Sequence, residues 1–240
     1  MLYHVGAAGI APGLDRTALL LMIHVVLVLI TAIGGRIVPS FTANWLRGRG
    51  KENFPRLSAP IDAATLALTV AAGIAVTFAP QNPVTGVIAL LTAVAHGLRL
   101  SRWSGLSTTA EPMLFVLHVA YAWFPVGYLL VAWSALGPMF GSGYPPSVAL
   151  HALTMGAIGV MIFAMTTRVS LGHTGRVPQA ARLTVIGYYL LNLAVVIRLA
   201  GPLFGAQYMR SVEIAAVAWM ATFGLFLWVY WPILTQPRVD

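Results

Sequence analysis

The chain has 240 residues, of which 59% are hydrophobic, 8% are charged and none is cysteine. A soluble domain carries about a quarter charged residues, so this composition excludes an ordinary soluble protein and predicts a polytopic membrane protein. The absence of cysteine excludes disulfides, iron–sulfur clusters and c-type haem attachment, so a bound transition metal needs histidine, methionine, carboxylate or carbonyl ligands.

Seven apolar stretches are long enough to cross a bilayer. A hydrocarbon core of about 30 Å requires about 20 helical residues, and Pro, Gly or charged residues separate the stretches. The sequence therefore predicts an all-α bundle of about seven transmembrane helices in one transmembrane domain, residues 1–240. The expected helices cover residues 17–38, 61–79, 83–103, 111–136, 147–169, 182–204 and 210–234.

The basic residues predict the orientation of the chain. Lys and Arg gather in the first, third and fifth connections, whereas residues 137–146 carry no charge. Cytoplasmic loops carry an excess of Lys and Arg, so we expect the N-terminus outside and the C-terminus inside. The net charge of +8 is then an orientation signal. It indicates a lipid bilayer as partner and no nucleic acid.

One short segment is repeated in the two expected outer connections. Residues 137–148 and 201–212, which are 64 residues apart, are identical at seven of twelve positions, including Gly-Pro-x-Phe-Gly. One interpretation is a duplicated helix hairpin, as in transporters with parallel repeats. The alternative is that Gly-Pro-aromatic turns recur at membrane interfaces because of composition.

Four histidines lie inside the expected spans, in two layers. At 1.5 Å per residue, His24 and His151 lie about 10 and about 6 Å from the outer end. His96 and His118 each lie about 10 Å from the inner end. Neutral imidazole ligates haem iron and copper without a charge to desolvate. Each layer is therefore a candidate haem or copper site, although a single membrane histidine is usually a hydrogen-bond partner between helices.

Two arginines share these layers. Arg198 lies in the outer third of the sixth span and Arg36 near the inner end of the first. A guanidinium matches a carboxylate such as a haem propionate. The alternatives are that Arg36 and Arg99 snorkel to lipid phosphate and that Arg198 pairs with Glu213.

The fifth span combines a candidate soft-metal pair with small residues. In a regular helix Met155 lies one turn from His151, so the two could hold copper. Ala152, Gly156 and Gly159 form a neighbouring stripe that would admit a flat macrocycle. Plain helix packing is the commoner explanation of both features.

Three stretches carry a family resemblance. They are residues 34–42 (Gly-Gly-Arg-Ile-Val-Pro-Ser-Phe-Thr), Leu117-His118 with Tyr121 and Trp123, and residues 151–176 with Ser-Leu-Gly-His-Thr-Gly-Arg. Together they resemble the NnrS family, bacterial inner-membrane proteins of the nitric-oxide response that contain haem and copper. The resemblance implies the bacterial inner (cytoplasmic) membrane, haem b and copper as cofactors, and nitric oxide as ligand. Family members usually have about twelve spans, so we expect a short member or a C-terminal seven-helix portion.

The inner loop at 172–176 (Gly-His-Thr-Gly-Arg) has two interpretations. Backbone donors beside Arg176 could hold an anion such as a propionate, or the turn caps the fifth helix. The predicted metal ligands are His118, His151, His24 and Met155. The predicted cofactor-binding residues are His118, His151, His24, His96, Arg36, Arg198, His173 and Arg176.

Three functions follow as hypotheses. The first is a haem-binding protein, with copper as a further candidate, that protects against or responds to nitric oxide and nitrosative stress. Whether it is an enzyme stays open. The second is a b-type electron carrier that exchanges with quinone or another respiratory electron donor. The third is a membrane transporter without metal.

Overall fold

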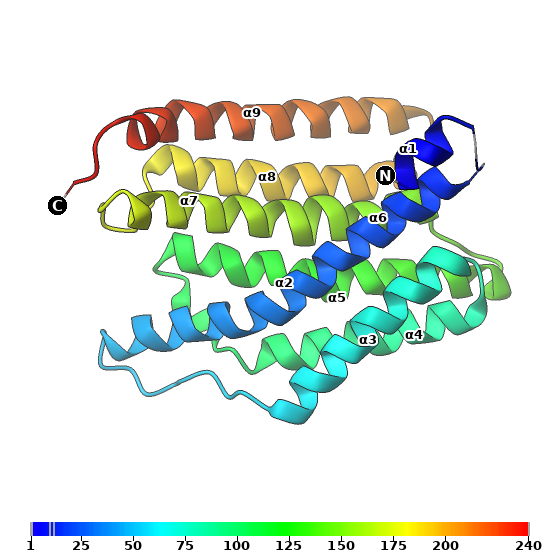
Figure 1. The fold of residues 1–240 in the computed structure, drawn as a ribbon, viewed down its shortest axis with the longest axis horizontal. Helices are drawn as coiled ribbons and strands as arrows, with labels where there is room; N and C mark the ends of the chain where they lie inside the picture. The colour runs from blue at the N-terminus through cyan, green and yellow to red at the C-terminus, as the bar shows by residue number, and fades with distance from the viewer. Residues whose placement is uncertain (1, 10, 12, 240) are drawn as a thin grey trace.

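The computed structural model describes residues 2–9, 11 and 13–239, and every regular element in them is helical. The prediction of an all-α fold is therefore confirmed. Six helical stretches of the described chain are long and apolar enough to cross a membrane. The sixth, residues 182–235, contains two helices that run in opposite directions (Figure 1).

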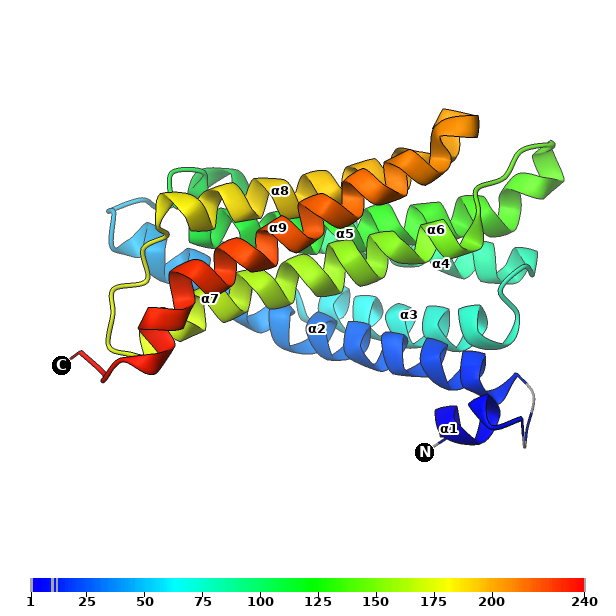
Figure 2. The same cartoon turned by 90° about the horizontal axis from the view of Figure 1, so that it is seen from above.

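Successive long helical segments run in alternating directions along the long axis of the bundle, and residues 146–173 form one continuous segment (Figures 1 and 2). The α-helices are α1 (Leu2–Ala7), α2 (Leu14–Arg47), α3 (Ala59–Phe78), α4 (Pro83–Ser101), α5 (Pro112–Leu136), α6 (Pro146–His151), α7 (Met161–His173), α8 (Arg182–Ala200) and α9 (Tyr208–Thr235). Four further segments are the 3-10 turns η1 (Gly105–Thr108), η2 (Gly137–Phe140) and η4 (Gly201–Gln207) and the π-helix η3 (Ala152–Val160).

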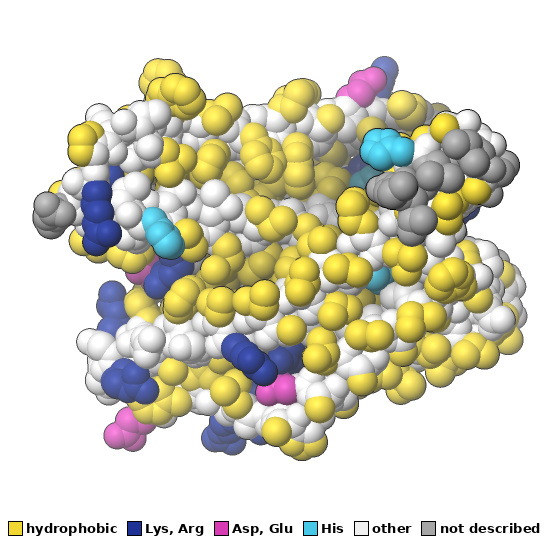
Figure 3. Space-filling view, viewed as in Figure 1, with side chains coloured by type: hydrophobic (Ala, Val, Ile, Leu, Met, Phe, Trp, Pro, Cys, Tyr) yellow, Lys and Arg dark blue, Asp and Glu magenta, His cyan; other side chains and the backbone are white. Residues whose placement is uncertain are grey.

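The connections divide the bundle into two ends. The basic end contains connections 48–58, 102–111 and 174–181, and the opposite end contains 79–82, 137–145 and 201–207 (Figure 1). Figure 3 shows hydrophobic side chains over most of one face, with many of the Lys and Arg side chains toward the basic end. This surface suits a lipid environment.

Helix α2 is longer than the expected span 17–38. Its 34 residues extend over about 51 Å, and it crosses the other helices at an angle (Figure 1). The helix continues through Pro39 to Arg47 because Val38, Pro39 and Thr42 are buried against neighbouring helices. Packing therefore outweighs the loss of one backbone donor at proline.

The repeated Gly-Pro segments both form 3-10 turns that include or end at a glycine with positive φ. Segment η2 ends at Gly141, which has φ +68°, and η4 contains Gly205, which has φ +51°. Glycine adopts this left-handed region without steric penalty. Both turns therefore reverse the chain at the opposite end, between α5 and α6 and between α8 and α9.

The expected regular helix 147–169 contains a π-helical segment instead. Bonds in a π-helix run to the fifth residue, so the stripe expected from 100° per residue is lost between 152 and 160. The small residues admit tryptophan rings. A Cβ at Gly156 would lie 2.6 Å from Trp123 Cγ, and a Cβ at Gly159 2.6 Å from Trp219 Cη2. The stripe thus serves helix packing.

Candidate functional site

His118 is held in one tautomer by α2. Its ring is 4% exposed, and Nε2 lies 2.9 Å from Thr42 Oγ1. The Thr42 hydroxyl donates its proton to the Val38 carbonyl at 2.9 Å, because a carbonyl can only accept. Nε2 must therefore donate to Thr42, which leaves Nδ1 of His118 as an unprotonated acceptor.

This Nδ1 atom is buried and finds no hydrogen-bond partner among the described residues. A Cβ at Gly105 of η1 would lie only 2.7 Å from it, so any larger residue at this position would collide with the imidazole. His118 also lines a cavity of about 670 Å³ at the basic end. Its apolar wall includes Phe115, Val119 and Ala122, and its polar residues include Asn53, Arg56, Ser101, Arg102, Ser104 and Ser107.

His96 is placed differently, with both ring nitrogens engaged. Nε2 lies 3.0 Å from Thr69 Oγ1 and Nδ1 lies 2.9 Å from Tyr121 Oη. Its ring is fully buried and stacks on Phe124 with a centroid distance of 4.6 Å. His96 therefore joins α3, α4 and α5 and offers no free nitrogen to a metal.

Arg99 extends this polar cluster toward the basic end. Its side chain is 5% exposed, and Nε donates to Asp62 Oδ1 at 2.7 Å. Nη1 donates to the Thr31 carbonyl at 2.7 Å and to Tyr121 Oη at 3.1 Å. Arg99 is thus a buried partner of Asp62 and does not snorkel to lipid. Sequence reasoning missed this pair, although both residues lie near the same end of adjacent spans.

The predicted inner pair of histidines does not share one site. The Trp103 ring lies beside His118, with centroids 6.3 Å apart, and beside Tyr121, with centroids 4.3 Å apart. Tyr121 in turn bonds His96. Aromatic side chains therefore separate the two imidazoles.

The outer histidines each bond their own helix. Nδ1 of His24 donates to the Leu20 carbonyl at 2.8 Å, and Nδ1 of His151 donates to the Ser147 carbonyl at 2.6 Å. Nε2 of His24 is buried without a partner in the described chain. No group of three or more His, Asp or Glu residues that could hold a metal occurs among the described residues.

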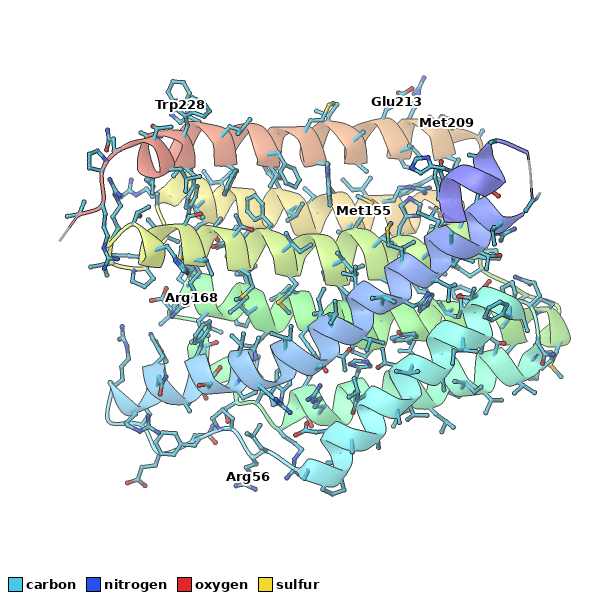
Figure 4. All side chains as sticks on the ribbon, in the orientation of Figure 1. Arg56, Met155, Arg168, Met209, Glu213 and Trp228 are labelled. Carbon is cyan, nitrogen blue, oxygen red and sulfur yellow. The ribbon has the colours of Figure 1, made fainter. Side chains whose placement is uncertain are left out.

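Met155 lies on η3 (Figure 4) and packs against the hydrophobic core. Arg36 is exposed on α2, away from the buried cluster. Arg198 is half-buried, and its guanidinium carbon lies 5.5 Å from the Tyr208 ring centroid. Glu213 is exposed on the outer side of α9 (Figure 4). The one ion pair within the described residues is Arg99–Asp62, so Glu213 does not neutralise Arg198.

Arg176 ties the α7–α8 connection to the end of α9. Its guanidinium donates to the carbonyls of Thr174 and Ile233 at 3.3 and 3.4 Å and to Gln236 at 3.4 Å. His173 is exposed at the end of α7. Of the two interpretations of residues 172–176, these contacts favour the capping turn and not the anion site.

The segment at 34–42 connects α2 to three other helices. A Cβ at Gly35 would overlap the Arg99 guanidinium of α4. Phe41 lies under Arg168 of α7, with 4.5 Å from the guanidinium carbon to the ring centroid; Figure 4 shows Arg168 in this region. Thr42 fixes His118 of α5. The residues of segment 34–42 therefore make contacts between α2 and the helices around His118.

Comparison with known proteins agrees with these motifs. A family model described as NnrS protein matches residues 1–238. No curated protein and no solved structure matches the chain. Because the family match spans nearly the whole sequence, the chain belongs to the NnrS family.

Proposed function

We propose that this chain is a haem-binding integral membrane protein of the nitric-oxide response, and that His118 is a haem ligand. The observation that carries the proposal is the unprotonated, unpartnered Nδ1 of a buried imidazole that lines a 670 Å³ cavity. Membership in the NnrS family supports the link to nitric oxide.

The residues around His118 fit a haem group. Ligand cavities commonly have volumes of about 300–1,000 Å³, and this cavity lies in that range. Phe115, Val119 and Ala122 offer an apolar wall for the macrocycle, and Arg56 and Arg102 offer cations for propionates. Thr42 orients the imidazole by accepting its Nε2 proton, as outer partners of ligating histidines do.

Ferrous haem, when bound, supplies an iron that takes up nitric oxide. The chain itself contributes three things. Thr42 keeps the proton on Nε2 and away from Nδ1. Phe115, Val119 and Ala122 of α5 give the cavity an apolar wall. The α5 residues that line the cavity belong to a helix long and apolar enough to cross a membrane, so an apolar gas can approach His118 from lipid.

For copper, we propose a ligand in the other layer of histidines. His24 and His151 each have Nδ1 fixed on a backbone carbonyl, which leaves Nε2 free to ligate a metal. Burial of the unpartnered His24 Nε2 within the described bundle favours His24 over His151.

We further infer seven spans with the N-terminus outside. Helices α8 and α9 contain 19 and 28 residues and run in opposite directions (Figure 2), so each suffices for one crossing. The basic end would then face the cytoplasm. This topology corresponds to a multi-pass protein of the bacterial inner membrane.

The test is an optical spectrum of the purified protein and of the His118→Ala variant. We expect a Soret band that shifts when nitric oxide is added after dithionite reduction, and loss of most haem in the variant. The exposed His4→Ala variant should keep wild-type haem content.

Other outcomes would overturn the proposal. Absence of a Soret band after expression with added haem would favour a transporter. Low-spin six-coordinate haem that ignores nitric oxide would favour an electron carrier. Unchanged haem in His118→Ala would exclude His118 as the ligand.

A further inference from the structure

A second cavity lies at the opposite end of the bundle, between α2, α3, α5 and α6. Its volume is about 290 Å³. The described residues that line it all differ from those of the His118 cavity, so the inference goes beyond the proposed haem site. Apolar side chains form most of the wall, including Leu19, Leu20, Ile23, Val76, Val131, Ala149 and Leu150.

Ser134 of α5 places an unused hydroxyl in this apolar wall. The residue is 5% exposed, and its buried Oγ finds no hydrogen-bond partner in the described part of the chain. Buried polar groups are normally paired, so an unpaired one calls for an explanation such as a missing ligand.

The threonines in the same bundle show that Ser134 is unusual. A helix hydroxyl can satisfy itself by donating to the carbonyl four residues earlier. Ser134 makes no such bond within the described helix, so its hydroxyl proton has no acceptor there, and the residue lines the cavity. Hydroxyls that do make this bond belong to Thr31, Thr42, Thr69, Thr77 and Thr222.

A cationic donor lies on the rim of the same cavity. Arg16, near the start of α2, is exposed and contributes to the lining together with Pro80 and Pro146. The described lining thus contains three polar side chains, the buried Ser134 and the exposed Ser147 and Arg16, with apolar side chains around them.

We propose that this cavity binds the head group of a membrane quinone. A quinone head is an uncharged apolar ring with carbonyl acceptors on two opposite edges, and it reaches the cavity from the bilayer. One carbonyl would accept from Ser134 and the other would face Arg16. This arrangement gives the chain a lipid-soluble redox partner at the end of the bundle away from His118.

Two simpler occupants match the cavity less well. An acyl chain of a phospholipid would leave the Ser134 hydroxyl unpaired, although its phosphate could contact Arg16. An ordered water needs two to four polar partners, and nine of the twelve described lining residues are apolar.

The experiment uses the full chain in nanodiscs and a photoreactive azido-quinone, with a short-chain ubiquinone analogue as competitor. We expect labelled peptides from residues 16–23, 131–134 or 146–150, and loss of the label when the competitor is in excess. Ser134→Ala, which changes one oxygen, should weaken competitor binding about tenfold because one hydrogen bond is lost.

Matched variants make the test decisive. Ser40→Ala on the exposed side of α2 should leave quinone binding unchanged, and Ala149→Phe should abolish it by filling the cavity. Equal labelling in wild type and Ser134→Ala, or labels outside the three segments, would overturn the proposal. So would a tightly bound phospholipid that the quinone analogue cannot displace.

Haem content is measured on the same preparations. We expect it to be unchanged in Ser134→Ala, since the two cavities are separate. Loss of quinone binding with normal haem, or the reverse, therefore distinguishes failure of this inference from failure of the haem proposal.

Discussion

The helices α2–α5 and the hairpin α8–α9 differ in how many residues they bury and in how many hydrogen bonds join their helices. Helix α5 buries fourteen of its 25 residues, whereas α9 buries four of its 28, Ser211, Ala215, Thr222 and Tyr230. Side-chain bonds from Thr42, Thr69, Asp62 and Tyr121 join α2, α3, α4 and α5. Between α8 and α9 the hydroxyls of Thr184 and Tyr230 lie 3.5 Å apart.

This difference shows where polar functional groups can be buried in a helical membrane protein. Helices in lipid associate through close packing and interhelical hydrogen bonds, because lipid tails are as apolar as the helices. Polar groups therefore survive where several helices surround them, as around His96 and Arg99. The hairpin instead presents large apolar side chains outward, such as Trp228, which is 77% exposed (Figure 4).

The largest effect should come from breaking the buried ion pair. Asp62→Ala leaves the Arg99 guanidinium, 5% exposed, without its carboxylate, and we expect a loss of about 3 kcal/mol in the free energy of unfolding. Reversible unfolding in mixed detergent measures it. The exposed Glu213→Ala should change this free energy by less than about 0.5 kcal/mol, and equal effects of the two would contradict the assignment.

Adjacent glycines provide a sharper test of the same region. Gly35→Ala would push a methyl group into the Arg99 guanidinium and should destabilise the protein by about 2 kcal/mol. Gly34→Ala meets Ile30 at an ordinary 3.7 Å and should be neutral or stabilising by up to about 1 kcal/mol. If both variants behave alike in the unfolding assay, α2 does not pack on Arg99 as described.

Thr42→Val tests how α2 positions His118. Removing the hydroxyl frees Nε2 from its acceptor, so we expect haem affinity to fall about 10- to 100-fold. Haem titration followed at the Soret band measures it. Thr42→Ser keeps the acceptor and should restore most of the affinity, whereas a purely structural role for Thr42 predicts equal affinity in both variants once folded.

The smallest effect is expected on the hairpin. Trp228→Ala removes a large side chain that faces outward from α9, and we expect a change below about 0.5 kcal/mol in the free energy of unfolding. A loss comparable to that of Asp62→Ala would mean that α9 is covered by another surface, and the contrast between the two regions would disappear.

The sequence predicted part of the candidate site. Histidines at membrane depth and the 34–42 string pointed to α2 and α5, which meet at His118, because an intramembrane ionisable residue and a glycine pair can be recognised in the sequence alone. It did not separate His96 from His118. That distinction depends on Thr69, Tyr121 and Thr42, which lie 25 to 76 residues away in the chain from the imidazole that each contacts.

The π-helix and the Arg99–Asp62 pair were missed for related reasons. A π-helical segment has the same composition as an α-helix, so the pattern 152–160 predicted a regular period. Arg99 resembled a snorkelling residue because its depth alone does not reveal Asp62 on the neighbouring helix.

Composition and hydropathy by themselves determined a helical membrane protein, since a backbone in lipid must satisfy its own hydrogen bonds and apolar runs of this length leave helices as the solution. Tertiary structure alone decided which imidazole nitrogen stays free, which arginine is buried and where the two cavities lie. Those properties depend on which side chains meet across helices, and rotations of helices with the same sequence pattern would give different neighbours.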